Sequence, residues 1–185
     1  MTKTEARKLA KACRAAVDLH TVGHAMAGVL FALPAWQHAD TVLAFASMPD
    51  EPDTADILRQ ALAESKRLLL PRVLSRTEMD WVEITALSQL QPGAYGILEA
   101  PASLPAFDTA HLGDGALALI PCLAASPDGV RLGRGGGYYD RFLAHYKGKR
   151  LLVCPTAGLL GDLPCEGWDV RFSPHEILTE KGILL

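Results

Sequence analysis

Short apolar segments recur along the chain, separated by segments in which apolar residues follow a helical spacing. Four of the apolar segments read VLAFAS, RLLLPRV, ALALIP and RLLVCP, at residues 42–47, 67–73, 116–121 and 150–155. They do not alternate polar with apolar residues, which is typical of strands that are covered on both faces. The pattern therefore predicts four strands of a mostly parallel sheet.

Two helices are predicted between these strands. The first covers residues 54–66, where Thr54 is a plausible N-cap. The second is a short helix over residues 138–148, which read YYDRFLAHYKG. This alternation of strand and helix indicates an α/β fold with helices on both sides of the sheet. The apolar residues that share one face of the first helix are Ile57, Leu58, Ala61 and Leu62.

The rest of the chain carries weaker signals. Residues 91–107 are rich in Pro, Gly and Ala and are predicted to be a long connection, while residues 173–185 are predicted to be a short helix or an irregular tail. A chain of 185 residues can bury one good core but is short for two domains. We therefore expect residues 1–185 to form a single domain.

Composition and charge limit the partners and the cellular location that we expect. A net charge of −3 gives no general attraction to nucleic acid or to an anionic membrane, so we expect neither as a partner. The N-terminus lacks the apolar core of a signal peptide and no run is long enough to span a bilayer, so a cytoplasmic location is expected. The cysteines contain no CxxC pair and are expected to be buried apolar residues: Cys13, Cys122, Cys154 and Cys165.

The stretch GRGGGYYD, residues 133–140, follows a predicted strand and opens a predicted helix. Glycines before a helix N-terminus let backbone N–H groups surround an anion, and the helix dipole favours negative charge there. Arg131 and Arg134 flank the turn and could pair with phosphate oxygens. Asp140 lies in the first helical turn, where its carboxylate could hold a magnesium ion that bridges phosphates.

Neither of the two common glycine motifs fits this loop. It lacks the Lys-Ser/Thr ending of the Walker A motif, and Tyr138 stands where the dinucleotide fingerprint requires glycine. A flexible turn, with Asp140 as a charge at a helix N-terminus, therefore remains an alternative. His20 and His24 have a spacing suited to a metal, but no third ligand is evident, so surface histidines are expected.

The segment RLGRGGGYYDRFL, residues 131–143, resembles the signature of the 5-formyltetrahydrofolate cyclo-ligases. Further segments match that family in its own order: KTEAR, FASMPDEPDT, LLLPRV, GILEA and LPCEGWDV. The resemblance implies a three-layer α/β/α sandwich with a mixed sheet. It also implies that 5-formyltetrahydrofolate is closed to 5,10-methenyltetrahydrofolate with ATP and Mg²⁺, by a monomer whose partners are small molecules.

The resemblance assigns the nucleotide side of a site. Lys3 and Arg7 would reach the ATP phosphates from one helix face, although their spacing alone favours a solvated basic face. Asp140 and Asp169 would hold Mg²⁺, Arg134 and Tyr139 would be the catalytic residues, and Tyr139 would lie beside the formyl group. The residues expected to bind ATP are Lys3, Arg7, Arg131, Gly133, Arg134, Gly135, Gly136, Gly137, Tyr138 and Tyr139.

The folate side centres on Glu51, whose carboxylate could accept hydrogen bonds from the N–H groups of a pterin. Met48 and Trp81 could flank the flat ring system. Without the resemblance, turn polarity and core packing are the better interpretations of these three residues. The residues expected to bind the folate are Ala46, Met48, Glu51, Trp81, Arg134, Gly135, Gly136, Gly137 and Tyr138.

Several positions depart from the family pattern. The segment PCLAASPD has Ala125 where the family has an aromatic residue, which puts the packing of the substrate in doubt, and Gly158 stands near the place of a usual Gln. Further departures are Ala100, Cys122 and Ser126. Two rival hypotheses follow: a non-catalytic relative that binds nucleotide or folate, and a small kinase that acts on another substrate.

Overall fold

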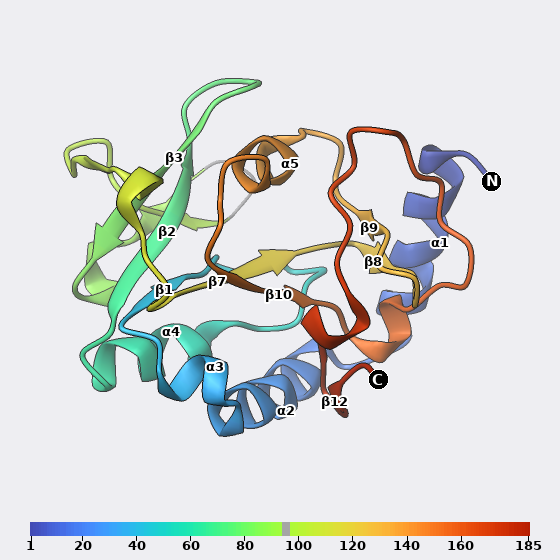
Figure 1. Cartoon of the computed structure of the whole chain (residues 1–185), viewed down its shortest axis with the longest axis horizontal. Coiled ribbons are helices and arrows are strands. Elements are labelled where there is room, and N and C mark those ends of the chain that lie inside the picture. The colour runs from blue at the N-terminus through green and yellow to red at the C-terminus, as the bar shows by residue number, and fades with distance from the viewer. Residues whose placement is uncertain (94–96) are drawn as a thin grey trace.

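The computed structural model describes residues 1–93 and 97–185, and its centre is a mixed eight-stranded sheet (Figure 1). The strand order is β12-β11-β10-β7-β1-β2-β3-β6; the five strands from β11 to β2 pair in parallel, and β12, β3 and β6 pair antiparallel with their neighbours. This confirms the predicted α/β class. The strands are β1 Thr41–Leu43, β2 Arg67–Val73, β3 Met79–Ile84, β6 Ala106–Phe107, β7 Ala116–Pro121, β10 Lys149–Val153, β11 Ile177–Thr179 and β12 Gly182–Ile183.

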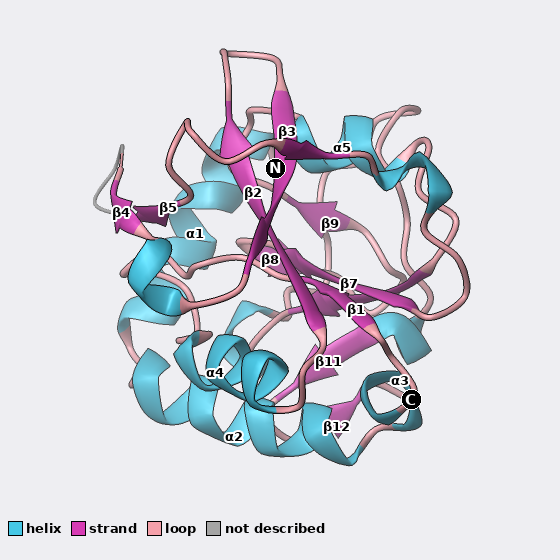
Figure 2. Cartoon of the chain, turned by 90° about the vertical axis from the view of Figure 1, so that its left-hand side faces the viewer, coloured by secondary structure: helices cyan, strands magenta, loops and turns pink. Residues whose placement is uncertain are grey.

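Helices lie on both faces of this sheet (Figures 1 and 2). One face is covered by α2 (Leu19–Ala32), α3 (Pro34–Gln37) and α4 (Ala55–Ala63). The opposite face carries α5 (Tyr138–Leu143) and long loops. The three layers therefore follow the expected sandwich, with a second helical layer that is thin.

The buried stretches of the central strands are mainly apolar because each face of the sheet meets its own core. In β2, Leu68 and Leu70 pack toward α2 and α4, whereas Leu69 between them packs toward α5. All three side chains are buried. Successive strand side chains point to opposite faces, so each buried residue of a strand between two cores points into one of them. Polar residues are therefore disfavoured there.

The N-terminal helix α1 (Lys3–Ala15) stands beside the end of the sheet (Figure 1). It begins with a capping box in which Thr2 and Glu5 each accept a backbone N–H bond. Its small residues Ala6 and Ala10 pack against the hairpin of β8 (Ala124–Ala125) and β9 (Arg131–Leu132). No single helix among the described residues has the length and apolar character of a membrane span. Only the bent pair of α1 and α2, counted together, has both.

The strand predicted over residues 42–47 ends in the structure at Leu43. The chain leaves the sheet because Thr54 binds it: the Thr54 hydroxyl donates to the Phe45 carbonyl at 2.7 Å and accepts from the Ser47 N–H at 3.1 Å. Thr54 occupies the N-cap position of α4 but does not cap it with its side chain. Asp53 accepts a hydrogen bond from the Ala55 N–H instead, at 2.8 Å.

The C-terminal segment is also more regular than predicted. Residues 173–185 form a 3₁₀ turn followed by β11 and β12, which extend the central sheet. Ile177 and Leu178 are fully buried there, so burial rather than local pattern makes this segment a strand. The helix predicted over 138–148 ends at Leu143, and the strand predicted over 150–155 runs from Lys149 to Val153.

The predicted connection over 91–107 contains short strands, and its residues 94–96 lie outside the described part of the chain. The pair β4–β5 forms a small separate sheet. Of the four cysteines expected to be buried, Cys122 and Cys154 are, whereas Cys13 is half-buried and Cys165 is exposed. The strands of the connection are β4 Gln91–Pro92, β5 Leu98–Glu99 and β6 Ala106–Phe107, and the 3₁₀ turns outside it are Leu87–Gln89, Thr109–His111, Thr156–Gly158 and Pro174–Glu176.

Candidate active site

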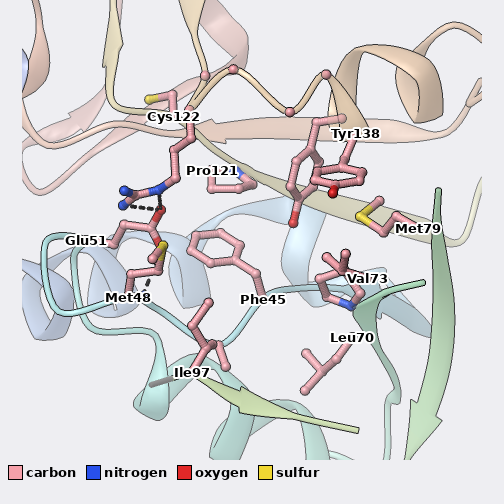
Figure 3. A pocket seen from close by; sticks show the side chains of 18 of the residues that line it. Phe45, Met48, Glu51, Leu70, Val73, Met79, Ile97, Pro121, Cys122 and Tyr138 are labelled. Carbon is pink, nitrogen blue, oxygen red and sulfur yellow. Dashed lines mark hydrogen bonds and ion pairs between the residues drawn. The ribbon is translucent and has the colours of Figure 1, made fainter. Parts of the chain in front are cut away.

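A cavity of about 480 Å³ lies against the glycine loop, residues 133–137, at the ends of β1 and β7 and beside β2 (Figure 3). Clefts at the carboxyl ends of parallel strands are the usual ligand sites of open α/β sheets. The walls are largely apolar, with a few polar groups at one end, which is the composition of a small-molecule pocket. The apolar walls include Phe45, Met48, Leu70, Val73, Met79 and Ile97.

The polar end of this cavity is formed by Glu51 and Arg134. The Glu51 side chain is only 6% exposed, and its Oε1 accepts from Nε and Nη2 of Arg134, both at 3.0 Å. Its Oε2 accepts from the Met48 N–H at 2.9 Å. Glu51 is therefore an oriented carboxylate whose acceptors face both the cavity and the loop.

Asp50 holds the other side of the same guanidinium, with its Oδ2 accepting from Arg134 Nη1 at 3.1 Å. Burial lowers the pKa of Arg134, but the hydrogen bond to Asp50 and the charge of Glu51 outweigh it, so the pKa rises. Burial raises the pKa of Asp50, and the bond to Arg134 reverses that shift. From the sequence, Arg134 is expected to pair with phosphates. In the structure its guanidinium points toward the acidic turn, residues 48–51, and lines the cavity.

A second hollow of about 430 Å³ lies on the other side of the glycine loop and is strongly charged. Lys3 and Arg7 reach it from one face of α1, as their spacing predicted. Lys3 Nζ donates to Asp169 Oδ2 at 2.8 Å and to Glu166 Oε2 at 2.5 Å, and Arg7 Nε donates to the Gly133 carbonyl at 3.0 Å. The sequence-predicted cations and Asp169 therefore meet in one place, although they come from opposite ends of the chain.

The glycine loop forms a wall that both hollows share. Gly133, Gly135, Gly137, Arg131 and Asp140 line both of them. The buried Arg131 donates from Nη2 to Asp140 Oδ1 at 2.7 Å, which fixes the start of α5 to β9. Two ligands, one in each hollow, would approach each other across this loop.

Two loop positions require glycine. Gly135 has φ +104° and Gly137 has φ +67°, both in the region that side chains disfavour. A Cβ on Gly135 would also lie 3.3 Å from Arg7 Nη2. Because α5 has only six residues, its dipole is short, and an anion here would depend on loop N–H groups and nearby cations more than the sequence suggested.

Asp140 and Asp169 both line the charged hollow, and each is already paired with a cation. Burial raises the pKa of Asp169, but the hydrogen bond from Lys3 outweighs it and lowers the pKa, so the carboxylate is ionised at neutral pH. Within residues 1–93 and 97–185 no cluster of three His, Cys, Asp or Glu suits a metal. Two carboxylates do fit Mg²⁺ that arrives with phosphates, since this ion commonly takes one or two carboxylates plus phosphate oxygens.

Trp81 is not among the residues that line either hollow. It was expected to flank the substrate, and in the structure it lies buried in β3. Its ring stands edge-on to Tyr139, with centroids 6.3 Å apart, and packs against Phe142 at 4.9 Å. Trp81 therefore supports Tyr139, which lines the cavity and whose pKa is raised by burial.

The structure brings other residues that were expected to bind the folate together around the cavity. Ala46, Met48 and Gly136 line the cavity, and so does Tyr138, whose hydroxyl donates to the Ser75 carbonyl at 2.7 Å. Away from the site, His20 and His24 are exposed and bind Asp53 and Asp56 through Nδ1 at 2.9 and 2.7 Å. The histidines are therefore surface residues, as expected.

Sequence reasoning missed Arg14 and Trp168. Arg14 is buried and donates to the carbonyls of Asp50, at 3.1 Å, and Cys122, at 2.6 Å, so it ties α1 to the acidic turn. Arg14 stands seven residues after Arg7 and therefore lies on the same helix face, which is the feature of the sequence that could have identified it. Trp168 lines the charged hollow and sits beside the predicted Asp169.

Three departures from the family pattern now have positions. Ala125 is buried on β8 and lines neither hollow, so the doubt it raised about substrate packing is not supported. Gly158 is enclosed by Cys154 and Leu123, where a Cβ would be 3.2 Å from the Cys154 Sγ. Cys122 does line the cavity.

The sequence matches the 5-formyltetrahydrofolate cyclo-ligase family over residues 2–180. Among curated relatives, the 5-formyltetrahydrofolate cyclo-ligase of Mycolicibacterium smegmatis is 29% identical, covering 78% of this chain and 76% of its own. That of Escherichia coli K12 is 31% identical, covering 71% of this chain and 74% of its own. The NMR structure of Aquifex aeolicus 5,10-methenyltetrahydrofolate synthetase superposes with a TM-score of 0.83 at 26% identity, covering 99% of this chain and 92% of its own. The chain therefore belongs to the 5-formyltetrahydrofolate cyclo-ligase family, a family of ligases.

Proposed function

We propose that the protein cyclises 5-formyltetrahydrofolate to 5,10-methenyltetrahydrofolate in a reaction that consumes ATP and requires Mg²⁺. The observation that carries this proposal is the pair of hollows on the two sides of one glycine loop. One is apolar with a carboxylate at its end, and the other is lined by cations and carboxylates. A reaction between a flat, partly apolar substrate and a polyphosphate needs two such sites that share a wall.

The apolar cavity is the folate side of this proposal. A pterin ring between Phe45 and Met48 would direct its N–H donors at Glu51, an acceptor-only group when ionised. The Glu51 carboxylate is already oriented by Met48 N–H and Arg134, so little rearrangement is needed to receive the ring. The formyl group would then face the glycine loop, beside Tyr139.

The charged hollow is the nucleotide side. Phosphates would lie over Gly133–Gly137, with Lys3 and Arg7 as counter-charges. Asp140 and Asp169 would hold Mg²⁺, which supplies neutralisation of phosphate charge. Burial lowers the pKa of Lys3, but its bonds to Asp169 and Glu166 outweigh this and raise it, so the ammonium stays charged at any neutral pH.

The chemistry explains why both sites must meet. An N-formyl group is an amide, so its carbon is a poor electrophile and its oxygen a poor leaving group. Transfer of the terminal phosphoryl group of ATP to that oxygen removes both obstacles, after which N10 attacks the carbon and inorganic phosphate leaves. The protein's residues position the two ligands and offset charge, with Arg134 between the acidic turn and the loop.

The direct test follows the absorbance of methenyltetrahydrofolate with and without ATP. ATP-dependent formation supports the proposal. ATP and folate binding without product would indicate the non-catalytic relative, and ADP release on another acceptor would indicate the kinase. Either result would overturn the proposed activity.

Gly135→Val is expected to abolish nucleotide binding at the loop. A β-branched residue is strained at φ +104°, and its side chain would occupy the space through which phosphate must approach the backbone. Calorimetric titration with MgATP measures the effect. Gly161→Val is the matched control, since Gly161 has no neighbour within 4 Å of its Cβ position and lines neither hollow. Unchanged ATP affinity in Gly135→Val would remove the loop from the nucleotide site.

A further inference from the structure

The rim of the charged hollow carries an exposed tryptophan. Trp168 is 73% exposed, whereas the chain's other two tryptophans, Trp36 and Trp81, are 1% and 3% exposed. Tryptophan is enriched at interfaces because its ring is apolar and its N–H is polar, so an exposed indole on the rim of a polar hollow is a candidate contact group.

The position of this indole is set by the same ion pairs that define the hollow. Trp168 lies in a turn closed by the Asp169 N–H, which donates to the Glu166 carbonyl at 3.0 Å. The Glu166 N–H donates to Asp169 Oδ2 at 2.7 Å, and Lys3 bridges both carboxylates from α1. These bonds place the backbone of Trp168 at the edge of the proposed phosphate site.

Trp168 is the one aromatic ring among the described residues that line the hollow. The rest of the lining consists of charged side chains, glycines, Ala144 and Leu132. A nucleoside triphosphate with its phosphates over the glycine loop must place its base near the hollow's edge. Aromatic faces bind bases by stacking, and the two-ring system of a purine covers an indole better than a pyrimidine does.

We propose that Trp168 is the platform on which the purine base of the nucleotide stacks. This inference rests on the proposed function, because it assigns the base of the same nucleotide. It adds that the base is held by a face contact at the loop 166–169, away from the folate cavity. Trp168 does not line that cavity, so the contact acts on nucleotide affinity alone.

Iodide quenching of tryptophan fluorescence isolates this residue, since Trp36 and Trp81 are buried. MgATP is expected to reduce the iodide-accessible emission several-fold. Inorganic tripolyphosphate with Mg²⁺, which has phosphates and no base, is expected to bind and leave Trp168 accessible. Equal protection by both ligands would mean that the loop closes on phosphate without stacking, and would overturn the inference.

Trp168→Ala provides the second measurement. Its Kd for MgATP should rise roughly 5- to 150-fold, the range measured for loss of a base–aromatic stack, while its Kd for tripolyphosphate should stay at the wild-type value. Trp168→Phe should recover most of the ATP affinity. Leu74→Ala is the matched control, because Leu74 is also an exposed large apolar residue and lines neither hollow.

These measurements distinguish a failure of the base platform from a failure of the proposed nucleotide site. If Trp168→Ala binds MgATP as tightly as the wild type, the base platform is wrong and the proposed function stands. If the wild type binds neither MgATP nor tripolyphosphate, the nucleotide site itself is wrong and both proposals fall. Equal loss of ATP and tripolyphosphate affinity would show that Trp168 shapes the phosphate site, and would also overturn the stacking role.

Discussion

Asp140→Asn should lose most turnover, by about a hundredfold or more, while keeping its fold. The substitution removes a hard anionic oxygen that we propose as a Mg²⁺ ligand. The amide oxygen can still accept the bond that Arg131 Nη2 now makes to Asp140 Oδ1, so the start of α5 should stay in place. Turnover measured across a Mg²⁺ titration, with thermal unfolding in parallel, tests the prediction.

Asp128→Asn is the matched control for this variant. Asp128 is also a loop carboxylate paired with an arginine, Arg171, at 3.0 Å, but it lines neither hollow. It should turn over like the wild type. A wild-type rate in Asp140→Asn at every Mg²⁺ concentration would leave Asp140 as the partner of Arg131 alone. A large drop in unfolding temperature would instead attribute the loss to the buried guanidinium left without its counter-charge.

The fold was predictable from the sequence where a strand is buried on both faces, because consecutive residues of such a strand are apolar. β2 and β7 were predicted with their observed bounds because β7 is an unbroken apolar run and β2 has a core of consecutive leucines, Leu68 to Leu70. β3 was missed since its polar Asp80 and Glu83 hide a strand that is recognisable only by its antiparallel pairing with β2. β11 has three residues, and it is a strand because it pairs with the distant β10 and with β12.

The sequence indicated which residues lie at the site better than it indicated how their side chains are arranged. The glycine signature and the resemblance indicated Glu51 and Arg134, but nothing local indicates that side chains 83 positions apart in sequence would bind each other. Trp81 points to the same face of β3 as Met79, which lines the cavity, but the rings of Tyr139 and Phe142 pack on it, and local sequence does not show that contact. Trp168 was passed over because exposure is a property of the folded loop.

Glu51→Gln should weaken binding of 5-formyltetrahydrofolate by roughly ten- to a hundredfold, since hydrogen bonds to charged groups contribute about 1.5 to 3 kcal/mol each. Glutamine keeps one acceptor oxygen and turns the other into an N–H₂ donor. That donor would face the pterin's own N–H groups, the Met48 N–H or the Arg134 guanidinium, all of which are donors. Affinity for MgATP measured without folate should barely change, because Glu51 does not line the charged hollow.

Asp50→Asn separates a direct contact with the pterin from an indirect effect through Arg134. Asp50 binds the same guanidinium as Glu51 but does not line the cavity. If Glu51 holds the pterin, calorimetric titration should show the folate affinity lost in Glu51→Gln and nearly intact in Asp50→Asn. Similar losses in both variants would mean that release of Arg134 causes the effect, and an unchanged folate affinity in Glu51→Gln would end the assignment of Glu51 as the pterin anchor. Equal loss of folate and ATP affinity would point to a disturbed fold, because Glu51 lines the cavity and does not line the charged hollow.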